Sequence, residues 1–207
     1  MVVRFAAALA LGLAAFATPA AAQVPSPVEF LGHEIGADHR LCNYTDLVRY
    51  FRAVEARTDR MQLVDIGATS YGQRMRMAVI SSPANLARLD RLREICRGLS
   101  KGEGIDDAAA RAMAEEGRAF VWIDSGLHAT ELLAGQHIIE LVGQRTSRDD
   151  PEEPRIMDEV VLLACPLNPD GLELVANAYR AKRRSSIPVL YQRYIVHDTN
   201  RDHYANN

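Results

Sequence analysis

The sequence has little excess of charge of either sign. Its 207 residues carry 24 Lys and Arg against 27 Asp and Glu, a formal net charge of −3. Chains that bind nucleic acid or an anionic membrane surface are usually strongly basic. The near balance therefore indicates neither partner. Internal repeats, low-complexity segments and an interdomain linker are also missing, so we expect a single domain.

Cysteine is scarce as well. The three cysteines, Cys42, Cys96 and Cys165, are odd in number and form no Cys-x-x-Cys pair. A disulfide scaffold is therefore not indicated. Cys165 stands in an apolar run and is expected to be a buried, inert thiol, while a bridge between Cys42 and Cys96 remains open.

No apolar run is long enough for a membrane anchor, which needs about 20 apolar residues. The run at residues 5–16 follows a positive start and is broken by Pro19. Ala20, Ala21 and Ala22 then give a small-residue cleavage pattern. This order is typical of a secretory signal peptide. We predict cleavage after Ala22, a mature chain of residues 23–207, and a secreted or periplasmic protein with no membrane attachment.

Apolar periodicity predicts helices and strands in turn. Asn43 can cap a helix that begins near Tyr44, and the stretch "LVDIGATSYGQRMRMAVISS" is typical of a hairpin. Further helices are expected at residues 83–99, 106–117, 129–144 and 172–182, further strands at 119–124, 160–166 and 191–196, and a charged loop at 146–155. Strands alternating with helices favour an α/β sheet covered on both faces.

The pattern His-x-x-Glu occurs twice, at His128 and Glu131 and at His137 and Glu140. The second pair lies inside a predicted helix, where we expect an ordinary surface pair. The first pair spans the loop between a strand and the next helix. Ligands of open α/β sheets bind outside the carboxyl ends of strands, and imidazole with carboxylate suits zinc. Position therefore favours His128 and Glu131, although a chance match remains possible on this ground alone.

Three more motifs follow in a fixed order. "NPDG" stands at residues 168–171, the basic "YRAKRRSS" follows it, and "DTNRD" ends the series at residues 198–202. Together with His128 and Glu131, this order resembles the zinc carboxypeptidases of the carboxypeptidase A type, the M14 metallopeptidase family. The resemblance extends from about residue 30 to the last motif. It implies a mixed, mostly parallel sheet with helices on both faces, which we expect to be incomplete at the C-terminus.

The resemblance also implies roles for individual residues. His128 and Glu131 match two zinc ligands, and Asn200 and Arg201 match the pair that holds the terminal carboxylate of a substrate. An arginine fork fits a carboxylate well. Arg183 matches the arginine that stabilises the oxyanion, judged by its distance from the NPDG motif. Arg180 and Arg184 are alternative candidates for this role.

Two features depart from the family pattern. Asp202 replaces the usual asparagine after the Asn-Arg pair, which puts strict C-terminal specificity in question. No position matches the family's third zinc ligand or its catalytic glutamate, since His197 and His203 only flank the motif. We therefore expect residues 23–207 to be the N-terminal part of a catalytic domain, inactive alone.

The function that the resemblance implies is zinc-dependent hydrolysis of peptide bonds by an activated water, with protein tails or cell-wall peptides as substrates. Two alternatives stay open at this point. One is a non-catalytic peptide-binding protein on the same scaffold. The other is a related zinc amide hydrolase, such as a deacylase of small acyl-amino acids.

Overall fold

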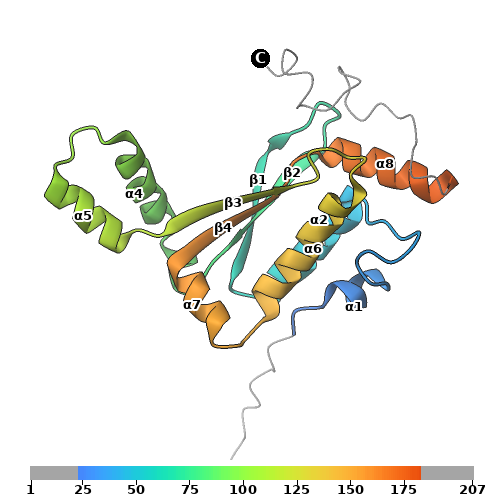
Figure 1. The fold of residues 1–207 in the computed structure, drawn as a ribbon, viewed down its shortest axis with the longest axis horizontal. Coiled ribbons are helices and arrows are strands. Elements are labelled where there is room, and N and C mark those ends of the chain that lie inside the picture. Colours follow the sequence, from blue (N-terminus) through green and yellow to red (C-terminus); the bar gives the residue numbers. More distant parts are fainter. Residues whose placement is uncertain (1–22, 183–207) are drawn as a thin grey trace, which may run out of the picture.

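A mixed four-stranded sheet forms the centre of the molecule (Figure 1), and the computed structural model describes residues 23–182. In chain order the elements are α1 (Pro27–Leu31), α2 (Tyr44–Glu55), β1 (Met61–Ala68), β2 (Arg74–Ile80), α3 (Pro83–Ala87), α4 (Leu89–Lys101), α5 (Asp107–Glu116), β3 (Ala119–Ser125), α6 (Leu132–Ser147), α7 (Glu152–Glu159), β4 (Val160–Pro166) and α8 (Pro169–Lys182). The strand predicted at residues 191–196 lies outside the described residues.

The strand order is β1-β2-β4-β3. The predicted hairpin is confirmed, because β1 and β2 pair antiparallel from Met61 opposite Ile80 onward. β2 then pairs antiparallel with β4, and β3 runs parallel to β4 over its whole length. The α/β class and the mixed sheet are confirmed. Within the described strands only one pairing of three is parallel, since the hairpin supplies one side of the sheet.

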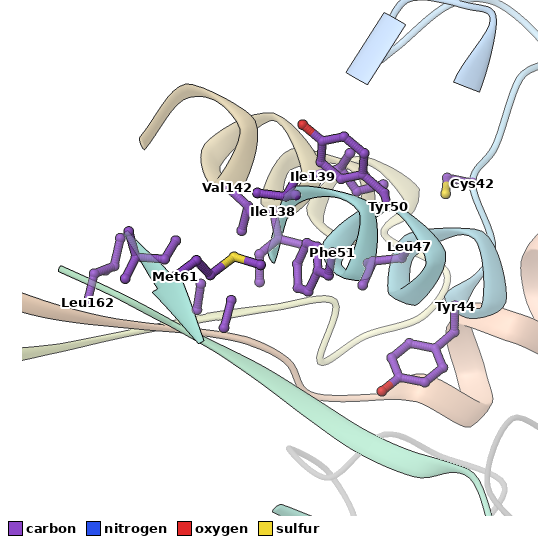
Figure 2. Close-up of a cluster of buried hydrophobic side chains, with 14 of the residues drawn as sticks. Cys42, Tyr44, Leu47, Tyr50, Phe51, Met61, Ile138, Ile139, Val142 and Leu162 are labelled. Carbon is purple, nitrogen blue, oxygen red and sulfur yellow. The ribbon is translucent and has the colours of Figure 1, made fainter. Parts of the chain in front are cut away.

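The main core lies between the sheet and the helices α2 and α6 (Figure 2). Asn43 caps α2 as predicted, its side chain accepting a hydrogen bond from the backbone of Asp46. Apolar residues at helical spacing then face the sheet. The fully buried side chains of the two helices are Leu47, Tyr50, Phe51, Val54, Ile138, Ile139 and Val142.

The opposite face of the sheet is covered by α3 and α4, through a smaller cluster of Val79, Leu86, Leu92 and Val161. One helix was predicted at residues 83–99, and the structure corrects this to two. Arg88 has φ of −119° and ψ of 24°, which interrupts the helix between Ala87 and Leu89. No Pro or Gly marks this break, so local composition did not show it.

The charged loop predicted at residues 146–155 is also corrected. It contains the end of α6 and the first half of α7. Glu153 is fully buried in α7 and accepts a hydrogen bond from Arg145 at 2.7 Å. Met157 of the same helix is buried against the main core. Arg145 belongs to α6 and Glu153 to α7. Because its partner lies in another helix, the burial of Glu153 could not be predicted from the polar residues around it.

All three cysteines are free, so the bridge between Cys42 and Cys96 is not formed. Cys165 is buried, as predicted. Burial, and secondarily the carboxylate of Asp124, raise the pKa of the Cys165 thiol to about 11, which leaves it protonated and unreactive at neutral pH. Within residues 23–182 no helix is long and apolar enough to cross a membrane.

Truncation of Phe51 should test the main core. Phe51→Ala removes a fully buried ring between α2 and the sheet, and we expect a loss of about 3–5 kcal/mol in the free energy of unfolding. Leu133→Ala is the control, because Leu133 is 66% exposed on α6; its effect should stay within about 0.5 kcal/mol. Denaturant unfolding monitored by circular dichroism measures both. If Phe51→Ala and Leu133→Ala lower the free energy of unfolding equally, the packing of α2 in the core is contradicted.

Candidate metal site

The chain turns sharply where β3 ends. Gly126 follows the strand with φ of +70°, a conformation that glycine adopts without strain. A Cβ atom at this position would also lie 3.4 Å from the Cα of Gly135 in α6. The loop between β3 and α6 therefore stays close to the helix that it enters.

His128 and Glu131 lie in this loop. The backbone N–H of Glu131 donates to the carbonyl oxygen of His128 at 3.1 Å, which closes a turn. α6 begins only at Leu132, three residues later than predicted. The two side chains are thus presented by a turn at the carboxyl end of a strand rather than by a helix face, and both line one open hollow of about 510 Å³.

The second His-x-x-Glu pair lines the same hollow. His137 is exposed on α6 and Glu140 is half-buried, with its carboxylate accepting from the amide of Gln144 at 2.9 Å. The expected surface position of His137 is confirmed, but its place beside the first pair was missed. The sequence signal was partial. The helical spacing of Leu133, His137 and Glu140 indicates that they share one face of the helix, but not that this face lines the hollow together with Asp124 of β3.

The NPDG motif holds the loop of His128 in place. The side-chain amide of Asn168 donates to the carbonyl oxygen of Leu127 at 3.1 Å, and its oxygen accepts from the backbone of Gly171 at 2.9 Å. The sequence predicts a turn at these four residues, followed by a helix. The structure shows that α8 already begins at Pro169, so Asn168 stands at the helix start and ties the loop to it.

Small residues let α8 approach this loop closely. A Cβ atom at Gly171 would lie 2.6 Å from the Cβ of Ala129, and one at Gly135 would lie 2.8 Å from Leu172. Real Cβ atoms do not come so close, so larger residues at either glycine would move the loop or the helix. Ala129 itself is buried, between the two possible metal ligands in the chain.

Asp170 joins a third segment to the same place. Its carboxylate accepts from the hydroxyl of Thr69 at 2.7 Å and the amide of Gln73 at 2.9 Å, both in the hairpin loop. The backbone of Tyr71 donates to it as well. One four-residue motif therefore fixes the hairpin loop through Asp170 and the His128 loop through Asn168.

The donor atoms at the hollow suit zinc, because imidazole nitrogen and carboxylate oxygen are common zinc ligands. Within residues 23–182, however, no group of three or more His, Cys, Asp or Glu side chains is arranged to hold a metal ion. His128 and Glu131 fit as two ligands of a site that needs a third. His137 and Glu140 share the hollow without completing that set.

Of the other predicted site residues, only Arg180 lies within the described part of the chain. Arg180, a rival for the oxyanion arginine, donates to the carbonyl oxygen of Leu41 at 2.6 Å and to the carboxylate of Asp46 at 2.8 Å. These contacts hold it at the far end of α8 from Asn168. The remaining predicted residues, Arg183, Arg184, Asn200 and Arg201, lie outside the described residues.

The family model of zinc carboxypeptidases matches residues 47–206. This span contains both the loop of His128 and the NPDG motif that holds it. The chain belongs to the zinc carboxypeptidase family. A search among curated proteins found no match.

The fold agrees with that family assignment. The crystal structure of thrombin activatable fibrinolysis inhibitor superposes with a TM-score of 0.50 at 13% identity. The match covers 77% of this chain and 31% of the other. The chain thus spans about a third of the length of that protein, and at this identity the likeness concerns the fold alone.

Gly171→Ala should disturb the contact between α8 and the loop of His128. Alanine normally stabilises a helix relative to glycine, yet here the new Cβ would lie 2.6 Å from the Cβ of Ala129 and 2.7 Å from the side-chain amide nitrogen of Asn168. We expect a net loss of about 1–3 kcal/mol in the free energy of unfolding.

Gly98→Ala in α4 is the matched control, because its Cβ would meet only the flexible end of Met113. That variant should be neutral or more stable. Ala129→Gly added to Gly171→Ala should restore part of the loss, because it removes the contact with Ala129 and leaves the contact with the amide of Asn168. Denaturant unfolding of the three variants measures these effects, and a double variant no better than Gly171→Ala would show that the Ala129 contact contributes nothing to the loss.

Proposed function

We propose that the protein is a secreted zinc metallocarboxypeptidase that hydrolyses peptide bonds at the C-terminal ends of peptides. The observation that carries the proposal is that His128 and Glu131 both line one hollow, beside the end of β3. Residues 1–22 would direct export as a cleaved signal peptide. Free peptides and cell-wall peptides are both suitable substrates for an exported enzyme.

His128 and Glu131 would hold the zinc ion with one nitrogen and one oxygen ligand. Zinc bound in this way supplies Lewis acidity, which polarises a carbonyl and acidifies water. The chain prepares the site for it by fixing the loop: Asn168 accepts and donates hydrogen bonds there, and Gly171 packs on Ala129. A loop held from two sides presents both ligands without paying the entropy of ordering at each binding event.

The third ligand and the glutamate that takes a proton from water are expected beyond residue 207, as the family resemblance implies. Within the printed sequence, Arg183 is proposed to stabilise the oxyanion that develops on the scissile carbonyl. It follows Lys182, the last residue of α8, and this helix begins at the motif that fixes the loop of His128. Asn200 and Arg201 are proposed to bind the terminal carboxylate of the substrate.

A pair of histidine variants tests the metal assignment. In the full-length protein, His128→Ala should abolish zinc binding and peptide hydrolysis, because a ligand is lost. His137→Ala should keep most of both, although His137 lines the same hollow. Zinc content by mass spectrometry and hydrolysis of a C-terminal reporter peptide are the measurements, with unfolding curves to check folding. Equal losses in two folded variants would overturn the choice of the first His-x-x-Glu pair over the second.

The specificity assignment is tested with one peptide as free acid and as C-terminal amide. A charge-assisted hydrogen-bond pair to the carboxylate contributes about 2–3 kcal/mol, or roughly 30- to 150-fold in rate. Arg201→Ala should lose this factor on the acid and little on the amide. Arg201→Lys should recover only part, because an ammonium lacks the planar fork. The measured quantity is kcat/KM of the full-length enzyme. If the wild type cleaves both peptides equally well, the exopeptidase assignment fails.

A further inference from the structure

A second hollow, of about 600 Å³, lies between the N-terminal segment and the helices α2 and α8. It shares no lining residue with the hollow of His128. In Figure 1 the segment that follows α1 runs beside both helices. Three arginines line this second hollow, together with two histidines and two aspartates. Its chemistry is therefore set by charged groups from three separate segments of the chain.

Two of the arginines share one carboxylate. Asp46 of α2 pairs with Arg49 at 3.1 Å and with Arg180 of α8 at 2.8 Å. Arg180 is also fixed by the carbonyl oxygen of Leu41, to which its Nε and Nη2 donate. Its Nη1 has no partner among residues 23–182. One carboxylate thus orients two guanidinium groups without neutralising both, and an excess of positive charge remains.

His39 is held in a strained conformation at the same hollow. Its φ of 61° makes it the only non-glycine residue with positive φ between residues 23 and 182. Its Nδ1 lies 2.9 Å from the hydroxyl of Tyr179, which anchors the ring to α8. Backbone strain of this kind persists where the surroundings hold it, and it is concentrated at binding sites. The contact with Tyr179 keeps an imidazole at the hollow.

The rim carries one charge of each sign. The side chains of Arg40 and Asp38 are exposed, and neither makes a hydrogen bond or an ion pair within the described part of the chain. Across the whole hollow, three guanidinium groups face two carboxylates. A metal ion does not suit this balance, and no metal-holding group of His, Cys, Asp or Glu exists among residues 23–182.

We propose that this hollow binds a small oxyanion, the carboxylate or phosphate group of a ligand. Arg180 and Arg49 are oriented in advance by Asp46, and Arg40 adds an uncommitted guanidinium at the entrance. Planar guanidinium forks suit both kinds of oxyanion. His39 contributes a further ring nitrogen. Asp38 opposes the anion and limits its affinity.

Isothermal titration calorimetry of the full-length protein at constant ionic strength tests the proposal, with sodium phosphate and sodium acetate as the two probes. Arg40→Gln should weaken binding roughly tenfold, since one charge-assisted hydrogen bond is lost. Asp38→Asn should strengthen it by about threefold, because a repelling charge at an exposed position is removed. Arg97→Gln is the matched control, an exposed arginine of α4 outside the hollow, and should change binding less than about twofold.

His39→Gly provides an independent arm. Glycine relieves the positive φ, so the melting temperature should stay equal or rise, while anion binding should weaken because the ring is gone. Preference for phosphate would assign the site to phosphorylated ligands, and preference for acetate to carboxylates. The proposal would be overturned if neither probe binds at concentrations up to about 20 mM, which is the range of very weak dissociation constants. Equal affinity in all variants would overturn it as well. Weaker binding in Asp38→Asn would also overturn it, since this is the response of a cation site.

Discussion

The position of the loop that carries His128 and Glu131 depends on the amide group of Asn168. The loop at residues 126–131 belongs to no strand or helix, and its backbone bonds of Glu131 to His128 and to Ala134 hold only its end. Buried backbone groups need hydrogen bonds. Asn168 donates to the carbonyl oxygen of Leu127 and accepts from Gly171, so one side chain connects the loop to the start of α8. Asp170 then attaches the hairpin loop to the same turn. Three segments far apart in sequence meet because one motif bonds to each.

Close packing makes this arrangement specific. The contacts of Gly135 with Leu172 and of Gly171 with Ala129 leave no room for an added methyl group, and Gly126 lies in van der Waals contact with Gly135. Protein interiors transmit a displacement of this size instead of absorbing it. At Gly135 and Gly171, glycine is needed because the neighbouring segment lies so close. At Gly126, glycine is needed because its φ is positive.

Much of this could be predicted from the sequence where the signal is local. The cap of α2 at Asn43, the hairpin and the buried strand β4 follow from residue type and spacing, and all are present. The helix break at Arg88 and the buried Glu153 depend on tertiary partners, so periodicity missed them. The ordered motifs pointed to the correct family, yet the common hollow of both His-x-x-Glu pairs required knowing that α6 begins at Leu132 and which face it turns to β3.

Helix α8 separates the two hollows by a fixed length. Its start holds the loop of His128 through Asn168, and its end places Tyr179 and Arg180 at the second hollow. Twelve residues at 1.5 Å per residue span about 18 Å. An extended chain covers roughly 3.3–3.6 Å per residue, so about five residues would be needed to bridge that distance. A single small oxyanion therefore cannot contact both hollows. The charge of the second hollow is also screened over about 18 Å at physiological salt, where the Debye length is about 8 Å. The oxyanion site proposed for the second hollow is therefore distinct from the zinc site proposed at His128 and Glu131.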